Sequence, residues 1–103
     1  MNDKILAAVK AGAEVYKYSC VGGNAHAVLD DQNLDDSCVQ FCLEYSRTST
    51  DPDYTKEQLA AEQECLGTML ELTELERRAV VEIICVLDTL RYRTEEKNGI
   101  GGE

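Results

Sequence analysis

Apolar residues recur at helical spacing near the start of the chain and through its second half, and a segment between them alternates in polarity. Over residues 3–12 they follow steps of three and four, which places them on one side of a helix. Asn2 or Asp3 can cap that helix, because their side-chain oxygens accept hydrogen bonds from unpaired backbone amides. The pattern predicts a short N-terminal helix with these residues on one face: Ile5, Leu6, Val9 and Ala13.

A β-hairpin is predicted next, over residues 14–30. Residues 14–21 alternate in polarity and are rich in strand-forming side chains. Gly22, Gly23 and Asn24 form a turn signal, and residues 25–30 follow as a second extended segment. An alternative is that the first helix continues to Tyr18.

A second helix is predicted over residues 36–46. The segment 30–36 is acidic, and Asp35 or Asp36 is well placed to cap a helix, since carboxylates are favoured at helix N-termini. A polar loop with a turn at Pro52 follows. The expected inner face of this helix consists of Cys38, Val39, Cys42 and Leu43.

Two capping boxes, Thr55 to Gln58 and Thr73 to Glu76, predict a helical hairpin with helices over 55–72 and 73–93. The stretch 79–87 is apolar on nearly every side, which is typical of a central helix or of one covered by a second subunit. We therefore expect a mainly helical α+β domain over 1–93 and a flexible Gly-rich tail over 94–103. The expected inward residues of the first of these helices are Leu59, Leu66, Met69 and Leu70.

The charge of the chain restricts its partners. It carries 10 Lys and Arg against 20 Asp and Glu, a net charge of −10. Nucleic acid and anionic membranes are unfavourable partners for such a chain. The sequence contains neither a membrane span nor a secretory signal, and its five cysteines are typical of reduced thiols. We expect a cytoplasmic protein, in the cytoplasm of a host cell if it is viral.

The segment from Cys20 to Asn33 is the densest in polar and reactive residues. Its pattern G-G-N-x-H-x-V-L-D-D-x-N resembles that of a group of small uncharacterised proteins from bacteriophages and prophages. The resemblance covers residues 20–46 and implies a viral or mobile-element origin without an established activity. The segment departs from the pattern at Ala25, Ala27 and Gln32. The matching residues are Gly22, Gly23, Asn24, His26, Val28, Leu29, Asp30, Asp31 and Asn33.

This segment admits a functional and a structural interpretation. In a strand, His26 and Asp30 share one face, and a histidine near carboxylates can act as a base or bind a metal ion. The structural alternative is a hydrogen-bonded histidine followed by an Asx turn and a helix cap. A lone histidine without a nucleophile argues against an enzyme. The candidate binding residues are Asn24, His26, Asp30, Asp31 and Asn33.

Two kinds of metal site can be compared with this part of the sequence. The opening of a calcium loop at Asp31 fails at its sixth and twelfth positions, where Asp36 and Cys42 stand in place of glycine and glutamate. A zinc site is the alternative, because thiolates and imidazole are the ligands that zinc prefers. The same cysteines can instead be small core residues, so no cofactor is favoured. The possible zinc ligands are Cys20, His26, Cys38 and Cys42.

Clustered arginines occur only near the end of the chain. Arg77 and Arg91 have acids three residues away, which predicts pairing within the helix. A small anion site at the hairpin is the alternative. The four arginines are Arg77, Arg78, Arg91 and Arg93.

These observations favour a small acidic, non-enzymatic, homodimeric protein that binds and inhibits a host protein. Carboxylates placed where phosphates normally bind can block an enzyme that handles nucleic acid. Anti-CRISPR or anti-restriction activity is one such function. One alternative is a small-ligand sponge or metal-binding protein that uses residues 20–42. Another is a structural or regulatory phage accessory protein assembled through its last helix.

Overall fold

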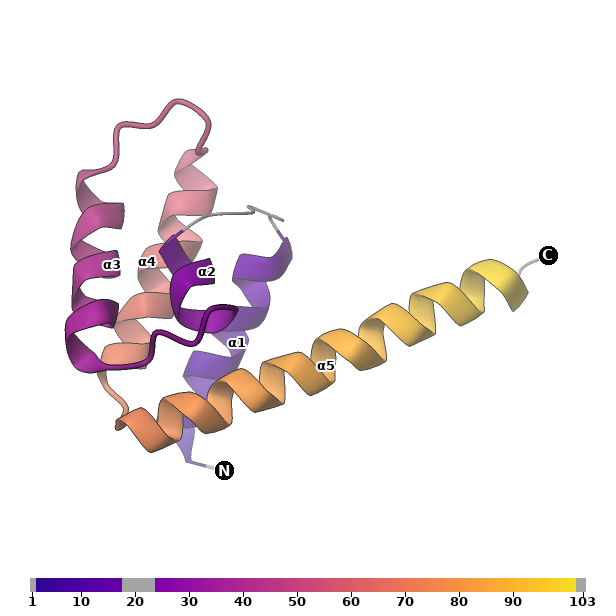
Figure 1. The fold of residues 1–103 in the computed structure, drawn as a ribbon. Helices are drawn as coiled ribbons and strands as arrows, with labels where there is room; N and C mark the ends of the chain where they lie inside the picture. Colours follow the sequence, from indigo (N-terminus) through magenta and orange to yellow (C-terminus); the bar gives the residue numbers. More distant parts are fainter. Residues whose placement is uncertain (1, 18–23, 102–103) are drawn as a thin grey trace.

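The computed structural model describes residues 2–17 and 24–101, with residues 91–101 as backbone only. The described residues form α1 (Asp3–Lys17), α2 (Asn24–Leu29), α3 (Asp36–Thr48), α4 (Lys56–Leu70) and α5 (Glu74–Gly101). Helix α4 packs between α1 and α3, and the short α2 contacts α1, α3 and α4 (Figure 1). Helix α5 packs across α1, and its C-terminal half extends away from the other helices (Figure 1).

The predicted β-hairpin over 14–30 is wrong, because the described residues of that segment are helical. Residues 14–17 complete α1, and residues 24–29 form α2. Val15 continues the helical spacing of Ala8 and Ala11, and all three are buried. Short apolar segments satisfy both periodicities, and here packing against α3 and α4 favours the helix. The predicted turn at 22–23 lies outside the described residues, as does Tyr18.

The predicted α+β class is therefore corrected to an all-helical one for the described residues. Because α2 is a helix, each of its apolar residues can face the same way at steps of three and four. A strand of this length would have sent alternate residues to solvent. The buried residues of α2 are Ala25, Val28 and Leu29.

The predicted caps are confirmed at three helix starts. The Asp35 carboxylate accepts a hydrogen bond from the Cys38 amide at 3.3 Å. The Thr55 hydroxyl accepts from the Gln58 amide at 3.1 Å, and the Gln58 side chain accepts from the Thr55 amide at 2.8 Å. Each cap satisfies backbone amides that a helix leaves unpaired, so the sequence fixes where these helices begin.

The same reciprocal pair closes the start of α5. The Thr73 amide donates to Glu76 Oε1 at 2.9 Å, and the Glu76 amide donates to Thr73 Oγ1 at 3.2 Å. At the start of α1, Asn2 rather than Asp3 is the cap, since Asn2 Oδ1 accepts from the Ile5 amide at 2.8 Å. Helix α4 ends at Leu70, and α5 continues past the expected end near Arg93 to Gly101.

The core lies between α1, α2, α3 and α4, and α5 adds to it where it packs on α1. Half of the predicted inward residues are buried and Leu6 is exposed. The partly buried ones are Ile5, Ala13, Cys38, Leu59 and Leu70. Gly12 marks the closest approach, because a Cβ at this position would lie 2.3 Å from Ile84 Cδ1 of α5. The largest fully buried apolar side chains are Leu29, Leu66, Met69, Val28, Val39 and Val80.

Helix α5 is not buried all round, contrary to one expectation from its sequence. Val80, Val81 and Ile84 lie in the core, whereas Val86 and Leu87 are 58% and 46% exposed. The radius of gyration is 14.4 Å, above the roughly 13 Å of a compact domain of this length, which agrees with the extended α5. Within the described residues, no helix has the length and apolarity needed to cross a membrane.

Candidate functional site

The candidate binding residues from Asn24 to Asn33 lie on α2 and on the loop that follows it. In a helix, residues four apart are neighbours on one face. His26 and Asp30 are therefore direct partners, and His26 Nδ1 pairs with Asp30 Oδ2. The His26 side chain is 20% exposed and that of Asp30 is 44% exposed, so the pair lies at the surface.

Tyr16 of α1 completes this group, although the sequence pattern had not singled it out. Its hydroxyl donates to Asp30 Oδ1 at 2.5 Å. Its ring meets the His26 ring edge-on, with centroids 6.0 Å apart and planes at 76°. The missed signal was the helical continuation of α1, which places Tyr16 four residues after Gly12. We refer to these three residues as the Tyr16–His26–Asp30 cluster.

Tyr16 remains a neutral hydrogen-bond donor in this cluster. Burial raises the pKa of its phenol far above the ordinary value, and the hydrogen bond to the Asp30 carboxylate raises it further. Cys85 and Asp88 of α5 act in the same direction. The cluster thus presents a carboxylate that already accepts from two side chains. It joins α1 to α2, and ligand binding by His26 and Asp30 remains a prediction.

The other three candidate residues do not join the cluster. Asn24 Nδ2 donates to Glu62 Oε2 at 3.3 Å and ties α2 to the nearly buried Glu62 of α4. Asp31 and Asn33 are exposed in the loop after α2. Between them, Gln32 has a φ of 56°, a conformation that glycine adopts with less strain. Gln32, one of the three residues at which the chain departs from the phage pattern, therefore lies at a backbone position that favours glycine.

The proposed zinc ligands do not converge in the part of the chain that the structure describes. Cys20 lies outside the described residues, and His26 is paired with Asp30. No group of three or more His, Cys, Asp or Glu among the described residues could hold a metal ion. Burial raises the pKa of the Cys65 thiol to about 12, and the nearby Glu62 carboxylate adds to this. This cysteine is thus a core thiol.

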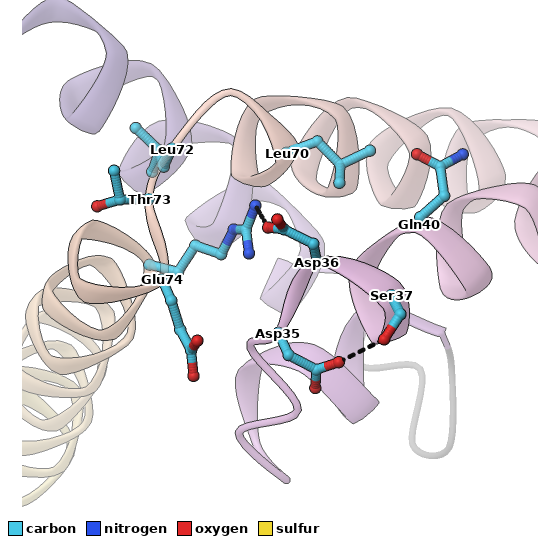
Figure 2. Close-up of a pocket in the computed structure, with 9 residues that line it drawn as sticks. Asp35, Asp36, Ser37, Gln40, Leu70, Leu72, Thr73 and Glu74 are labelled. Carbon is cyan, nitrogen blue, oxygen red and sulfur yellow. Dashed lines mark hydrogen bonds and ion pairs between the residues drawn. The ribbon is translucent and has the colours of Figure 1, made fainter.

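A depression of about 1120 Å³ lies where the N-termini of α3 and α5 meet (Figure 2). Arg77 lies beside it and is 1% exposed. Its Nε donates to the Met69 carbonyl at 2.7 Å, its Nη1 donates to the Leu34 carbonyl at 2.8 Å, and its Nη2 pairs with Asp36 Oδ1 at 2.6 Å. The expected pairing of Arg77 within its own helix is therefore wrong.

This depression does not favour a bound anion. Two helix N-termini attract negative charge, but Asp35, Asp36 and Glu74 already supply it at the rim (Figure 2). Since the Arg77 guanidinium bonds to Met69, Leu34 and Asp36, its role here is to connect α5 to α3 and to the end of α4. The depression is a structural junction in this chain.

Among the described residues, two groups of neighbouring apolar side chains are exposed, and the sequence pattern had not singled out the first of them. Phe41 and Tyr45 lie on the outer side of α3, are 65% and 58% exposed, and have ring centroids 6.2 Å apart. We name them the α3 aromatic pair. The signal was present, because an inner face at Val39 and Leu43 leaves positions 41 and 45 outside. The second surface, which we name the α5 stripe, consists of Ala79, Ile83, Val86, Leu87 and Leu90.

Comparison of the chain with protein-family models, curated proteins and solved structures finds no match.

Proposed function

We propose that this chain is a small acidic, non-enzymatic binding protein that inhibits a host protein by occupying a basic, partly apolar surface. The observation that carries the proposal is the α3 aromatic pair, two large exposed rings on a chain with a net charge of −10. Exposed aromatic side chains are enriched among the residues that dominate protein interfaces.

The surroundings of the α3 aromatic pair support a basic partner. Glu44 lies between the two rings in sequence and accepts a hydrogen bond from Gln40 at 2.9 Å, which holds its carboxylate on the same exposed side of α3. Arginine combines with such a surface in two ways, by pairing with the carboxylate and by stacking on an aromatic ring. A host surface that normally binds nucleic acid offers arginines of this kind.

The setting follows from the resemblance of residues 20–46 to small phage and prophage proteins. An acidic phage protein that occupies a nucleic-acid site would act as an anti-defence protein in the host cytoplasm, for example against CRISPR or restriction enzymes. We propose that it acts as a homodimer. The small-ligand and metal-binding alternatives gain no support from the described residues, since Tyr16 and His26 both pair with Asp30.

Capture from a nuclease-treated bacterial lysate tests the proposal. The wild-type chain is compared with the double variant Phe41→Ala/Tyr45→Ala and with the control Leu75→Ala, which removes an even more exposed apolar side chain from α5. We expect a basic protein that wild type and control retain and that the double variant retains at least about 10-fold less. Its elution by salt would show the expected ionic component.

Equal retention by the double variant would contradict the proposed role of the α3 aromatic pair, provided that circular dichroism shows equal helix content. The candidate residues on α2 are tested in the same assay with His26→Gln. Loss of capture without loss of melting temperature would make His26 a binding residue, whereas loss of melting temperature alone would support the structural interpretation.

A further inference from the structure

The α5 stripe has the spacing of a helix-pairing seam. Ala79, Ile83, Val86 and Leu90 follow one another at steps of four, three and four residues, which is the repeat at which one helix meets a second helix along its length. Leu87 lies beside this line. Ala79, Ile83, Val86 and Leu87, together with Glu82, line a shallow groove of about 370 Å³ on the outer side of α5.

The seam is exposed within one chain. Val86 and Leu90 are 58% and 55% exposed, and Ile83 is partly buried. The core side of α5, at Val80 and Ile84, is directed elsewhere, because these residues lie one step away on the helical wheel. Figure 1 shows α5 extending beyond the other helices, so the outer end of the seam is not covered by α1–α4.

We propose that the α5 stripe is the contact between two copies of this chain, with the two α5 helices antiparallel. The inference rests on the homodimer of the proposed function and adds its interface and its direction. The contact pairs Ala79 with Leu90 of the second copy and Ile83 with Val86 of the second copy.

The charges of α5 favour a second copy over a basic partner. The chain as a whole carries −10, but the sequence from 78 to 91 balances two arginines against two carboxylates. Glu82 is the one charged residue that lines the groove with the apolar residues. A basic partner would find little to recognise at this segment. Two identical balanced segments can approach each other without the repulsion that two carboxylate-rich surfaces would impose.

The antiparallel direction follows from side-chain size and from charge. In a parallel pair, Ala79 would face Ala79 and leave a gap, while Leu90 would face Leu90. In the antiparallel pair, Ala79 faces Leu90, so each pair of facing residues fills a similar volume between the two helices. This direction also separates the two acidic helical bodies along the seam and opposes the two helix dipoles.

The size of the seam sets the expected strength. Residues 79–90 span about three helical turns, or roughly 18 Å. We expect a seam of this length to bury less than the roughly 1,200–2,000 Å² of a standard stable interface. We therefore expect a reversible dimer in the micromolar range and not an obligate one.

Light scattering coupled to size exclusion tests the dimer at about 100 µM, above the expected micromolar dissociation constant. We expect wild type to run at twice the 11.4 kDa of the chain. We expect Val86→Glu and Leu90→Glu to run as monomers of equal helix content, because each places a carboxylate in the seam. The matched control Phe41→Glu, with a similarly exposed apolar residue on α3, is expected to stay dimeric. A monomeric wild type, or dimeric Val86→Glu and Leu90→Glu, overturns the proposal.

Cysteine crosslinking tests the direction. In a background with Cys20, Cys38 and Cys85 replaced by serine, Ala79→Cys/Leu90→Cys is expected to form a covalent dimer under mild oxidation. Leu90→Cys alone is not, since the two Leu90 positions lie about 16 Å apart along an antiparallel seam, from the rise of 1.5 Å per residue. Efficient crosslinking of Leu90→Cys alone would instead indicate a parallel pair and overturn the antiparallel assignment.

The proposed binding function and the proposed dimer interface can be refuted independently. Loss of host-protein capture in Phe41→Ala/Tyr45→Ala with an intact dimer tests the α3 aromatic pair alone. A monomeric wild type that still captures the host protein leaves the binding function in place and removes the α5 interface.

Discussion

At the scale of single residues, Arg77 makes contacts that no other side chain in the described structure replaces. It is 1% exposed and bonds to two carbonyls, those of Met69 and Leu34, and to Asp36. These groups come from the end of α4, the loop before α3 and the first turn of α3. One guanidinium thus supplies a donor to the buried Leu34 carbonyl and a further donor to the Met69 carbonyl, which also accepts from the Leu72 amide.

Replacing Arg77 should cost far more stability than replacing its acidic partner. Arg77→Ala leaves the buried Leu34 carbonyl without its donor and removes a large buried side chain, so we expect a loss of about 2–4 kcal/mol in the free energy of unfolding. Asp36 is 87% exposed, so Asp36→Asn should cost less than about 1 kcal/mol. Urea unfolding of both variants measures the difference, and equal losses would contradict this account.

The raised pKa of Tyr16 predicts that the protein loses stability at alkaline pH. Its pKa is raised above the ordinary 10.0, and those of Cys38, Cys42 and Cys65 are raised above 9.0. A group with a raised pKa stabilises the folded state fully below its unfolded pKa, and this contribution is lost as pH rises toward the folded value. Stability should therefore fall above pH 9. In Tyr16→Phe the decline above pH 10 should be shallower, as denaturant titrations at several pH values would show.

At the scale of elements, α1 and α5 are held together through Gly12. A Cβ at this position would lie 2.3 Å from Ile84 Cδ1, and Ile84 is itself 3% exposed, so its methyl group has little room to move. The absence of a side chain at position 12 therefore sets the distance between the two helices. That distance also brings Cys85 and Asp88 close enough to affect the pKa of Tyr16.

A double-mutant cycle tests this contact. Gly12→Ala should destabilise the protein by about 1–2 kcal/mol, because overpacking costs more than the roughly 1 kcal/mol that alanine gains in a helix. Ile84→Val removes the clashing methyl group and alone costs about 0.5–1.5 kcal/mol. The loss of stability in the combined variant should be about 1 kcal/mol smaller than the sum of the two single-variant losses. Additive losses would show that the two residues do not meet.

At the scale of the whole molecule, the charge of −10 acts against the compact state. Asp31 and Glu71 are exposed carboxylates that follow the C-terminal ends of α2 and α4. Carboxylates are unfavourable at that end of a helix, where the backbone already presents partial negative charge. The charge therefore serves binding of a basic partner, in the proposed function, at a cost in stability.

Salt should reveal this cost. At low ionic strength, Asp31→Asn/Glu71→Gln should gain about 0.5–2 kcal/mol, at roughly 0.3–1 kcal/mol per removed charge. At about 1 M NaCl the screening length falls to about 3 Å, so wild type and variant should approach each other. Thermal melts at fixed protein concentration compare the two. A gain that persists at high salt would point to a cause other than charge.

The sequence by itself determined where α3, α4 and α5 begin. Asp35, Thr55 and Thr73 cap these helices through contacts within three residues, which involve no distant part of the chain. Local contacts of this kind are fully specified by the identities of neighbouring residues. The same holds for the net charge.

The tertiary structure decided the remaining features, because each of them depends on which surfaces of the helices pack together. Residues 14–17 and 24–29 fit a strand or a helix by pattern, and packing favoured helices. Arg77 has an acid in its own helix, yet it bonds to Leu34, which is distant in sequence, once α3 and α5 meet. Likewise, only the packing of α1 showed that one side of the apolar segment of α5 remains uncovered, as the α5 stripe.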